Sequence, residues 1–289
     1  MVEHILAKTL LNTVPQPDTW FGLRYNMNLY RGCQHQCIYC DSRSACYQIA
    51  DFSSIQVKVN AHELLEEELA RKRVRGIIGT GSMNDPYMPV EKKYEQTGRA
   101  LDLIARFRFS VHVMTKSDLV LRDIELLQRI NQVFAAVSFS LSTADDHLAA
   151  RLEPGASPPS ERFAAMAELA RAGILTGVSL MPILPFLEDS EENLGDILDQ
   201  AASAGASYII PSLGVTLRDR QREYYFRKLD ELFPGISRRY RRFYGDQMYC
   251  DARNESLLQE FISERCDRLG LLQRFPTPQA KTIRQPLLF

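Results

Sequence analysis

Three cysteines stand within eight residues of one another, at Cys33, Cys37 and Cys40. The Cys-x3-Cys-x2-Cys spacing brings three thiolates around one small centre, and thiolate is the soft ligand that iron–sulfur clusters require. Three protein ligands on a four-iron cluster leave one iron open to chelate a small molecule. The spacing therefore predicts a metal centre that does more than pass electrons.

Two other metal sites use the same residues. A structural zinc site takes four ligands in pairs, and the only further donors nearby are His35 and Cys46. An ordinary four-thiolate cluster would recruit Cys46 or the distant Cys250 or Cys266. Catalytic thiol chemistry is disfavoured, because nothing in the sequence arranges a base beside one cysteine. The six cysteines are too unevenly spread for a disulfide framework.

The cysteines follow the first of six strand-like segments that alternate with amphipathic helical stretches. These segments are residues 24–30, 74–79, 109–115, 134–141, 174–181 and 207–213. Several are apolar on both faces, as is typical of parallel strands covered by helices. Six such units predict an α/β fold whose parallel sheet curves into a partial (β/α)6 TIM-like barrel, with functional residues at the carboxyl ends of the strands.

Helix boundaries are also readable. Asn60 is a predicted N-cap with Glu63 at the reciprocal capping-box position. Ser190 is the predicted N-cap of a later helix, and Gly173 and Gly205 are predicted C-cap glycines.

The organisation predicted for the chain has four parts. Residues 1–19 form an N-terminal segment, 20–217 the core domain, 218–275 a mostly helical C-terminal extension and 276–289 a flexible tail. The net charge of −1 excludes a protein that is basic all over. The N-terminus does not resemble a signal peptide, and no apolar run is long enough for a bilayer. A cytoplasmic protein without membrane contact is the resulting prediction.

The cysteine spacing, Tyr39 before the third cysteine and the position after the first strand resemble the radical S-adenosylmethionine (SAM) superfamily. Together with GTGSMNDPY at 79–87, they resemble its spore photoproduct lyase-like branch over residues 20–215. The resemblance implies a 4Fe-4S cluster on Cys33, Cys37 and Cys40. It also implies SAM on the open iron, its reductive cleavage to a 5′-deoxyadenosyl radical, and an electron donor such as flavodoxin or ferredoxin.

The resemblance also implies a set of cofactor contacts. Tyr39 would lie against the adenine of SAM, and Lys116 and Ser140 match positions that bind its carboxylate. Contacts to the methionine moiety are implied at the end of the second strand, by Gly79, Gly81, Ser82 and Asn84. Arg151 and Glu153 match the family pattern too, although a surface ion pair would explain them equally well.

The hydrogen-atom donor departs from the family. Spore photoproduct lyase returns a hydrogen atom from a cysteine well downstream of the cluster loop. Here Cys46 is the only cysteine between Cys40 and the GTGS segment, and Cys250 and Cys266 lie in the extension. These three are the candidate donors, and the substrate does not follow from the family.

Two features favour a nucleic-acid substrate. Arg238, Arg239, Arg241 and Arg242 alternate with aromatic residues, a composition that suits phosphates and unpaired bases. The last five residues resemble the peptide by which bacterial repair proteins hold the sliding clamp, with Pro286 in place of the usual leucine. The anchors of that peptide would be Gln285, Leu287, Leu288 and Phe289.

The sequence therefore predicts a radical SAM enzyme, lyase-like, that repairs or modifies a nucleic-acid base. One alternative keeps the chemistry and takes a peptide or small metabolite as substrate. Another is a non-catalytic iron–sulfur module that binds nucleic acid or associates with the clamp.

Overall fold

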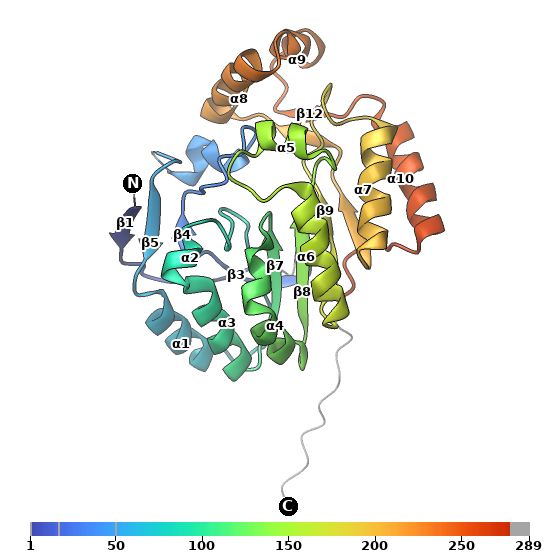
Figure 1. Ribbon diagram of the computed structural model, residues 1–289. Helices are drawn as coiled ribbons and strands as arrows, with labels where there is room; N and C mark the ends of the chain where they lie inside the picture. The colour runs from blue at the N-terminus through green and yellow to red at the C-terminus, as the bar shows by residue number, and fades with distance from the viewer. Residues whose placement is uncertain (1, 17, 50, 278–289) are drawn as a thin grey trace, which may run out of the picture.

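The computed structural model describes residues 2–16, 18–49 and 51–277. Its centre is a seven-stranded sheet in the order β10-β9-β8-β7-β6-β3-β2 (Figure 1). Six of the strands are parallel to one another: β3 (Leu23–Met27), β6 (Ile77–Thr80), β7 (Ser110–Thr115), β8 (Ala135–Ser140), β9 (Leu175–Leu180) and β10 (Tyr208–Pro211). Within the described ranges the sheet does not close, so the predicted partial barrel is confirmed.

Helices cover the outer face of this sheet (Figure 1). This arrangement is expected, because several strand segments are apolar on both faces. The helices are α1 (Ala61–Arg71), α3 (Gln96–Arg106), α4 (Ile124–Asn131), α6 (Pro159–Arg171) and α7 (Glu191–Ser203). Ile78, Val111 and Val137 face these helices within the largest apolar core. A second apolar cluster that includes Ile77 and Tyr208 uses the opposite face of the strands. Both faces are buried because the sheet curves around its own side chains.

Short elements connect the barrel strands. Residues 32–40, which carry Cys33, Cys37 and Cys40 and are called the cysteine loop below, lead into η1 (Asp41–Arg43) and η2 (Ala45–Tyr47). The remaining connectors are α2 (Glu91–Tyr94), η3 (Asp118–Asp123) and α5 (Asp146–Leu152).

The first residues of the chain take part in two sheets. β1 (Val2–Ile5) pairs with β5 (Ile55–Lys58), which also pairs with β4 (Tyr30–Arg31). β2 (Leu11–Thr13) runs antiparallel to β3 at the edge of the barrel sheet.

The C-terminal part lies against both the cysteine loop and the outer helices. It consists of β11 (Gly214–Thr216), α8 (Asp219–Leu232), α9 (Ile236–Tyr244), β12 (Tyr249–Asp251) and α10 (Glu255–Leu269). β11 and β12 pair antiparallel, α8 contacts η1 and η2, and α10 packs beside α7 (Figure 1). In the described residues no helix has the length and apolarity to cross a membrane. Most of the predicted tail, with the clamp-like peptide, lies outside the described residues.

The predicted helix ends are partly confirmed. The Ser190 hydroxyl accepts the Asn193 N–H as an N-cap should. The capping box at Asn60 is wrong: the Asn60 side chain exchanges hydrogen bonds of 2.8 and 2.9 Å with the Ala7 backbone instead. It thereby attaches the N-terminal segment to α1. Both C-cap glycines have left-handed backbones, with φ of +79° at Gly173 and +81° at Gly205.

Candidate active site

The cysteine loop lies at the carboxyl ends of the barrel strands. Cys33, Cys37 and Cys40 are free thiols, and all three line a cavity of about 120 Å³. Burial raises the pKa of each thiol, that of Cys33 to about 12. A metal centre would supply the positive charge that keeps them as thiolates. Three soft donors on one wall of a cavity fit an iron–sulfur cluster with an open iron.

The end of α5 and the residues after it are hydrogen-bonded to the backbone of the cysteine loop. The Ile38 N–H donates to the Leu152 carbonyl at 2.9 Å, and the Gly155 N–H donates to the His35 carbonyl at 3.0 Å. A Cβ at Gly155 would lie 2.1 Å from the Gln34 carbonyl oxygen. Only glycine permits this approach, so residues 151–155 (RLEPG) fix the loop that carries the thiols.

Glu153 is a buried carboxylate in contact with Tyr39 of the cysteine loop. It accepts hydrogen bonds from the Tyr39 hydroxyl and from Arg162, whose nitrogen is 2.5 Å away, and the Lys116 ammonium lies at 3.6 Å. Burial alone would raise its pKa, but Arg162 and Lys116 outweigh burial and lower the pKa to about 2. The prediction of a surface ion pair between Arg151 and Glu153 is wrong. The Arg151 guanidinium lies 3.9 Å from the Phe233 ring instead.

Lys116 and Ser140 meet on the cavity wall. The Lys116 ammonium donates to the Ser140 hydroxyl, which donates to the Met181 carbonyl at 3.2 Å. The Lys116 backbone N–H is 2.6 Å from an Asp85 carboxylate oxygen, and the Thr115 hydroxyl donates to the other oxygen at 2.7 Å. Asp85 therefore joins the loop after β6 to the end of β7 and fixes the point from which Lys116 extends.

The GTGS segment lets the chain turn tightly after β6. Gly81 has φ of +92°, and a Cβ there would lie 2.3 Å from the Met114 carbonyl oxygen. Ser82 exchanges hydrogen bonds with the Asn26 side chain, and the Asn84 amide donates to the Tyr30 carbonyl. Gly81, Ser82 and Asn84 line the cavity.

Two of the predicted cofactor residues are not on the cavity wall of the described structure. Gly79 lies inside β6, where a Cβ would collide with the Leu23 side chain. Tyr39 is buried, with its hydroxyl on Glu153 and its ring 5.9 Å from the Lys116 ammonium.

Sequence reasoning missed two buried charged residues of this region, Asp85 and Arg162, and considered His35 only as a zinc ligand. Asp85 stands in the GTGSMNDPY segment and could have been chosen for its position after a strand. His35 lines the cavity with its Nδ1 3.4 Å from Asp85; burial lowers the pKa of this imidazole, although Asp85 opposes the shift. Arg162 sits within α6, and no spacing links it to Glu153.

None of the three candidate hydrogen donors lines the cavity. Cys46 is exposed on η2, with its sulfur 3.2 Å from the Ser44 hydroxyl and 3.7 Å from Arg218. Cys250 is buried in β12 and Cys266 in α10.

The arginines of α9 are all exposed, but they are not equivalent. Arg239 lies over the Phe186 ring at 4.3 Å and Arg241 over the Phe226 ring at 4.8 Å. Tyr240 and Tyr244 are buried, whereas Phe243 is 65% exposed. The outer surface of α9 thus presents guanidinium groups and one exposed aromatic ring, Phe243, whose edge contacts are with Phe186 and Tyr244.

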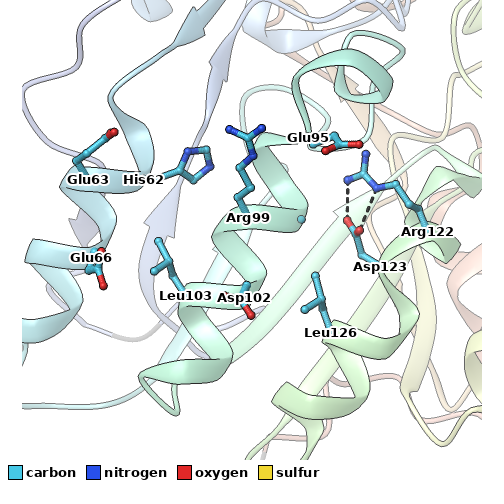
Figure 2. A pocket seen from close by; sticks show the side chains of 11 residues that line it. His62, Glu63, Glu66, Glu95, Arg99, Asp102, Leu103, Arg122, Asp123 and Leu126 are labelled. Carbon is cyan, nitrogen blue, oxygen red and sulfur yellow. Dashed lines mark hydrogen bonds and ion pairs between the residues drawn. The ribbon is translucent and has the colours of Figure 1, made fainter.

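A larger cleft of about 750 Å³ lies in the outer helical layer, away from the cysteines (Figure 2). Its walls carry charged side chains from α1, α3 and the η3–α4 junction, and Arg122 pairs with Asp123 at one end (Figure 2). No residue predicted for the site lines this cleft. Across the described ranges, no three His, Cys, Asp or Glu side chains converge as on a single metal ion.

Comparison with known proteins decides the family. The model of the radical SAM superfamily matches residues 27–199. The chain belongs to the radical SAM superfamily. This radical SAM protein is 31% identical over 270 residues to an uncharacterized protein of Mycobacterium tuberculosis, covering 90% of this chain and 78% of the relative. It is 24% identical over 178 residues to a radical SAM Nα-GlyT isomerase of Pseudomonas phage M6, covering 62% of this chain and 36% of that protein.

Solved structures show the same fold. Spore photoproduct lyase complexed with dinucleoside spore photoproduct superposes with a TM-score of 0.71 at 18% identity, covering 95% of this chain and 82% of the lyase. A double mutant of that lyase with bound AdoMet and dinucleoside spore photoproduct gives a TM-score of 0.70 at 17% identity with the same coverage. The resemblance to this branch is confirmed at the level of the fold.

Proposed function

We propose that this radical SAM protein cleaves SAM reductively and acts on a nucleic-acid base, in repair or modification. One observation carries the chemical part: three free thiols, Lys116 and Ser140 line one cavity at the carboxyl ends of the strands. When bound at Cys33, Cys37 and Cys40, a 4Fe-4S cluster with SAM supplies a 5′-deoxyadenosyl radical. The family implies both groups.

The residues of the cavity have separable tasks in this proposal. Lys116 offers an ammonium N–H to the carboxylate of SAM, and Asp85 holds its backbone while Ser140 directs its tip. The buried carboxylate of Glu153 lies 3.6 Å from this ammonium as its counter-charge and holds the Tyr39 ring in one orientation. The Gly81 backbone allows close approach of the methionine moiety. The surrounding buried side chains limit the access of water.

Two observations support a nucleic-acid substrate. The solved neighbour named above is a lyase in complex with a dinucleoside. On this chain, Arg238, Arg242 and the Phe243 ring are all exposed on α9. Guanidinium groups neutralise phosphates, and an exposed aromatic ring can stack on an unpaired base.

Anaerobic reconstitution tests the chemical part. The protein is loaded with iron and sulfide and reduced with dithionite in the presence of SAM, and 5′-deoxyadenosine is quantified. Product from the wild type, and none from the Cys33/Cys37/Cys40→Ala variant, is expected. A fully loaded protein that forms no product would favour the non-catalytic iron–sulfur module.

Deuterated oligonucleotides test the substrate part. Single-stranded DNA and RNA with deuterium in the base are offered to the active protein, and the expected result is deuterium in 5′-deoxyadenosine. Product without deuterium from either polymer, together with transfer from a deuterated peptide or metabolite pool, would assign the enzyme to the alternative substrate class.

A further inference from the structure

A second groove adjoins the cysteine loop on its outer side. It has a volume of about 410 Å³ and lies between the segments 43–49 and 51–52 on one side and α8 on the other. Its walls carry three guanidinium groups and two carboxylates beside two aromatic rings. The lining residues are Arg43, Ile49, Asp51, Phe52, Arg220, Glu223, Tyr224 and Arg227.

Alternating guanidinium groups and rings connect this groove to the cysteine loop. The Arg43 guanidinium lies 3.8 Å from the centre of the Tyr224 ring and 4.5 Å from that of Phe52. On the outer side, Arg227 lies 5.2 Å from the Tyr224 ring. On the inner side, Arg43 donates to the Gln36 side chain at 2.8 Å and lies 3.5 Å from the Cys37 carbonyl oxygen. Consecutive contacts therefore run from the backbone of a cluster cysteine to the wall of an open groove.

We propose that this groove is the docking site of an acidic electron-transfer protein that reduces the centre held by Cys33, Cys37 and Cys40. The inference rests on the proposed function, because reductive cleavage consumes one electron for each S–C bond broken. In the docked complex the donor is oxidised by one electron, the centre is reduced by one electron, and no bond or proton changes place. Short consecutive contacts favour this transfer, since electronic coupling falls steeply with distance.

The charges of the groove favour a protein over a nucleic acid. Arg220 and Arg227 are exposed, and Arg220 is held by the Ile49 carbonyl at 2.8 Å, so the positive charge is fixed at the rim. Asp51 and Glu223 stand among the guanidinium groups. Carboxylates at fixed positions repel a continuous phosphate chain, whereas an acidic protein can place its own charges to match both signs. The exposed arginines of α9 suit phosphates better.

The test compares two reductants. The reconstituted Arg220→Glu/Arg227→Glu protein is supplied either with dithionite or with a purified flavodoxin kept reduced by NADPH and its reductase. The flavodoxin-supported rate of 5′-deoxyadenosine formation is expected to fall about tenfold or more, while the dithionite-supported rate stays at the wild-type value. The dissociation constant for the same flavodoxin, measured by surface plasmon resonance on the as-purified protein, is expected to rise about tenfold.

A matched variant carries the same charge change on another face. Arg99→Glu/Arg129→Glu reverses two exposed arginines on α3 and α4, with Arg99 in the cleft of Figure 2. It is expected to keep the wild-type dissociation constant and both rates. Equal losses in the two double variants would overturn the proposal, because they would show only a general effect of net charge.

Tyr224→Leu separates docking from electron transfer. It removes the ring between Arg43 and Arg227 and keeps apolar volume, so reduction of the iron–sulfur absorption at saturating flavodoxin should be slower in stopped flow. An unchanged reduction rate would contradict the proposed route.

The remaining outcomes are also decisive. If Arg220→Glu/Arg227→Glu loses affinity for single-stranded DNA but not for flavodoxin, the groove belongs to nucleic acid and the docking site is wrong. If the wild type makes no 5′-deoxyadenosine with dithionite, the proposed function fails, whereas the flavodoxin binding measurement still decides whether the groove docks the donor.

Discussion

At the scale of single residues, Glu153 is a buried carboxylate that three side chains share near the cavity. It accepts from Tyr39 and Arg162 and lies 3.6 Å from the Lys116 ammonium. Glu153→Gln would leave the buried Arg162 guanidinium without its counter-charge, which typically costs about 3–5 kcal/mol. We expect the free energy of unfolding of the cluster-free protein, measured in urea, to fall by this amount.

The matched control is Glu67→Gln. Glu67 pairs with Arg71 on the surface of α1, where the two side chains are 61% and 77% exposed. Pairs of this kind contribute within about 0.5 kcal/mol, so the variant should unfold like the wild type. A similar loss in both variants would show that the buried pair at Glu153 is not special.

Gly81 should tolerate no side chain. Its φ of +92° strains any L-residue, and a Cβ would also lie 2.3 Å from the Met114 carbonyl oxygen. Gly173 has a comparable φ of +79° with nothing within 4 Å. We expect Gly173→Ala to lower the unfolding free energy by about 1 kcal/mol from strain alone, and Gly81→Ala to lower it by about 2 kcal/mol more. Equal melting temperatures for the two variants would contradict the close approach at Gly81.

Glu188 should give the protein a stability that depends on pH. The carboxyl is fully buried; one oxygen accepts the Leu184 N–H, and the other has no partner within the described structure. Burial raises its pKa to about 8 from a usual value of 4.5, with Glu153 adding to the rise and Lys116 opposing it. Between these two values the folded protein binds a proton that the unfolded chain releases. Stability therefore falls as pH rises through this window.

Glu188→Gln tests this linkage because a neutral amide of the same shape has no proton to lose. At pH 7 the variant should be more stable than the wild type by about 3 kcal/mol, and the difference should shrink towards zero below pH 4.5. Urea unfolding from pH 4.5 to 8 gives the comparison. A difference that is constant across pH would mean that Glu188 is ionised in the folded protein.

At the scale of elements, α9 combines a structural task with the proposed binding task. Arg239 covers the Phe186 ring, whose residue has an unusual φ of +69°, whereas no aromatic ring of the described residues lies under Arg242. Arg239→Gln should lower the unfolding free energy by about 0.5–1 kcal/mol. Arg242→Gln should keep wild-type stability and weaken binding of single-stranded DNA, with the salt slope reduced by about 1. Fluorescence anisotropy of labelled DNA between 50 and 200 mM salt measures the DNA affinity and its salt slope.

Two results would contradict these roles of Arg239 and Arg242. Unchanged DNA affinity in Arg242→Gln would remove α9 from the proposed interface, and unchanged stability in Arg239→Gln would mean that the stack on Phe186 contributes nothing.

The elements were predictable from sequence to the extent that their signals are local. Strands that are apolar on both faces predict a parallel sheet covered by helices. Ser190 caps its helix through a hydrogen bond to a residue three positions away. The cysteine spacing is a local signal too, and all three of these cysteines line the cavity. Contacts beyond one helical turn left no such signal: Asn60 binds Ala7 instead of capping α1, and Arg162, in the first turn of α6, meets Glu153 across the segment that joins α5 to α6.

At the scale of the whole molecule, the barrel has the cysteine-lined cavity at the carboxyl ends of its strands and packed side chains in its interior. Phe275, which follows α10, packs in the barrel interior against Phe21 and the His112 ring. Burial lowers the pKa of His112 to about 3, and this imidazole is hydrogen-bonded to Ser138, which in turn meets the Tyr208 hydroxyl. The C-terminal part of the chain thus completes the core of a barrel whose strands begin near residue 23.

Phe275→Ala tests whether this contribution holds the barrel together. Phe275 is 6% exposed, with ring neighbours at 5.0–6.0 Å that include Phe134 and Tyr208. Emptying such a site typically costs about 3–5 kcal/mol, so the urea midpoint should fall sharply, while Phe275→Leu should recover part of the loss. Phe243→Ala, at a position 65% exposed, should change stability by less than about 0.5 kcal/mol. Equal midpoints for Phe275→Ala and Phe243→Ala would mean that the barrel is stable without its C-terminal plug, and that residues after α10 are dispensable for the fold.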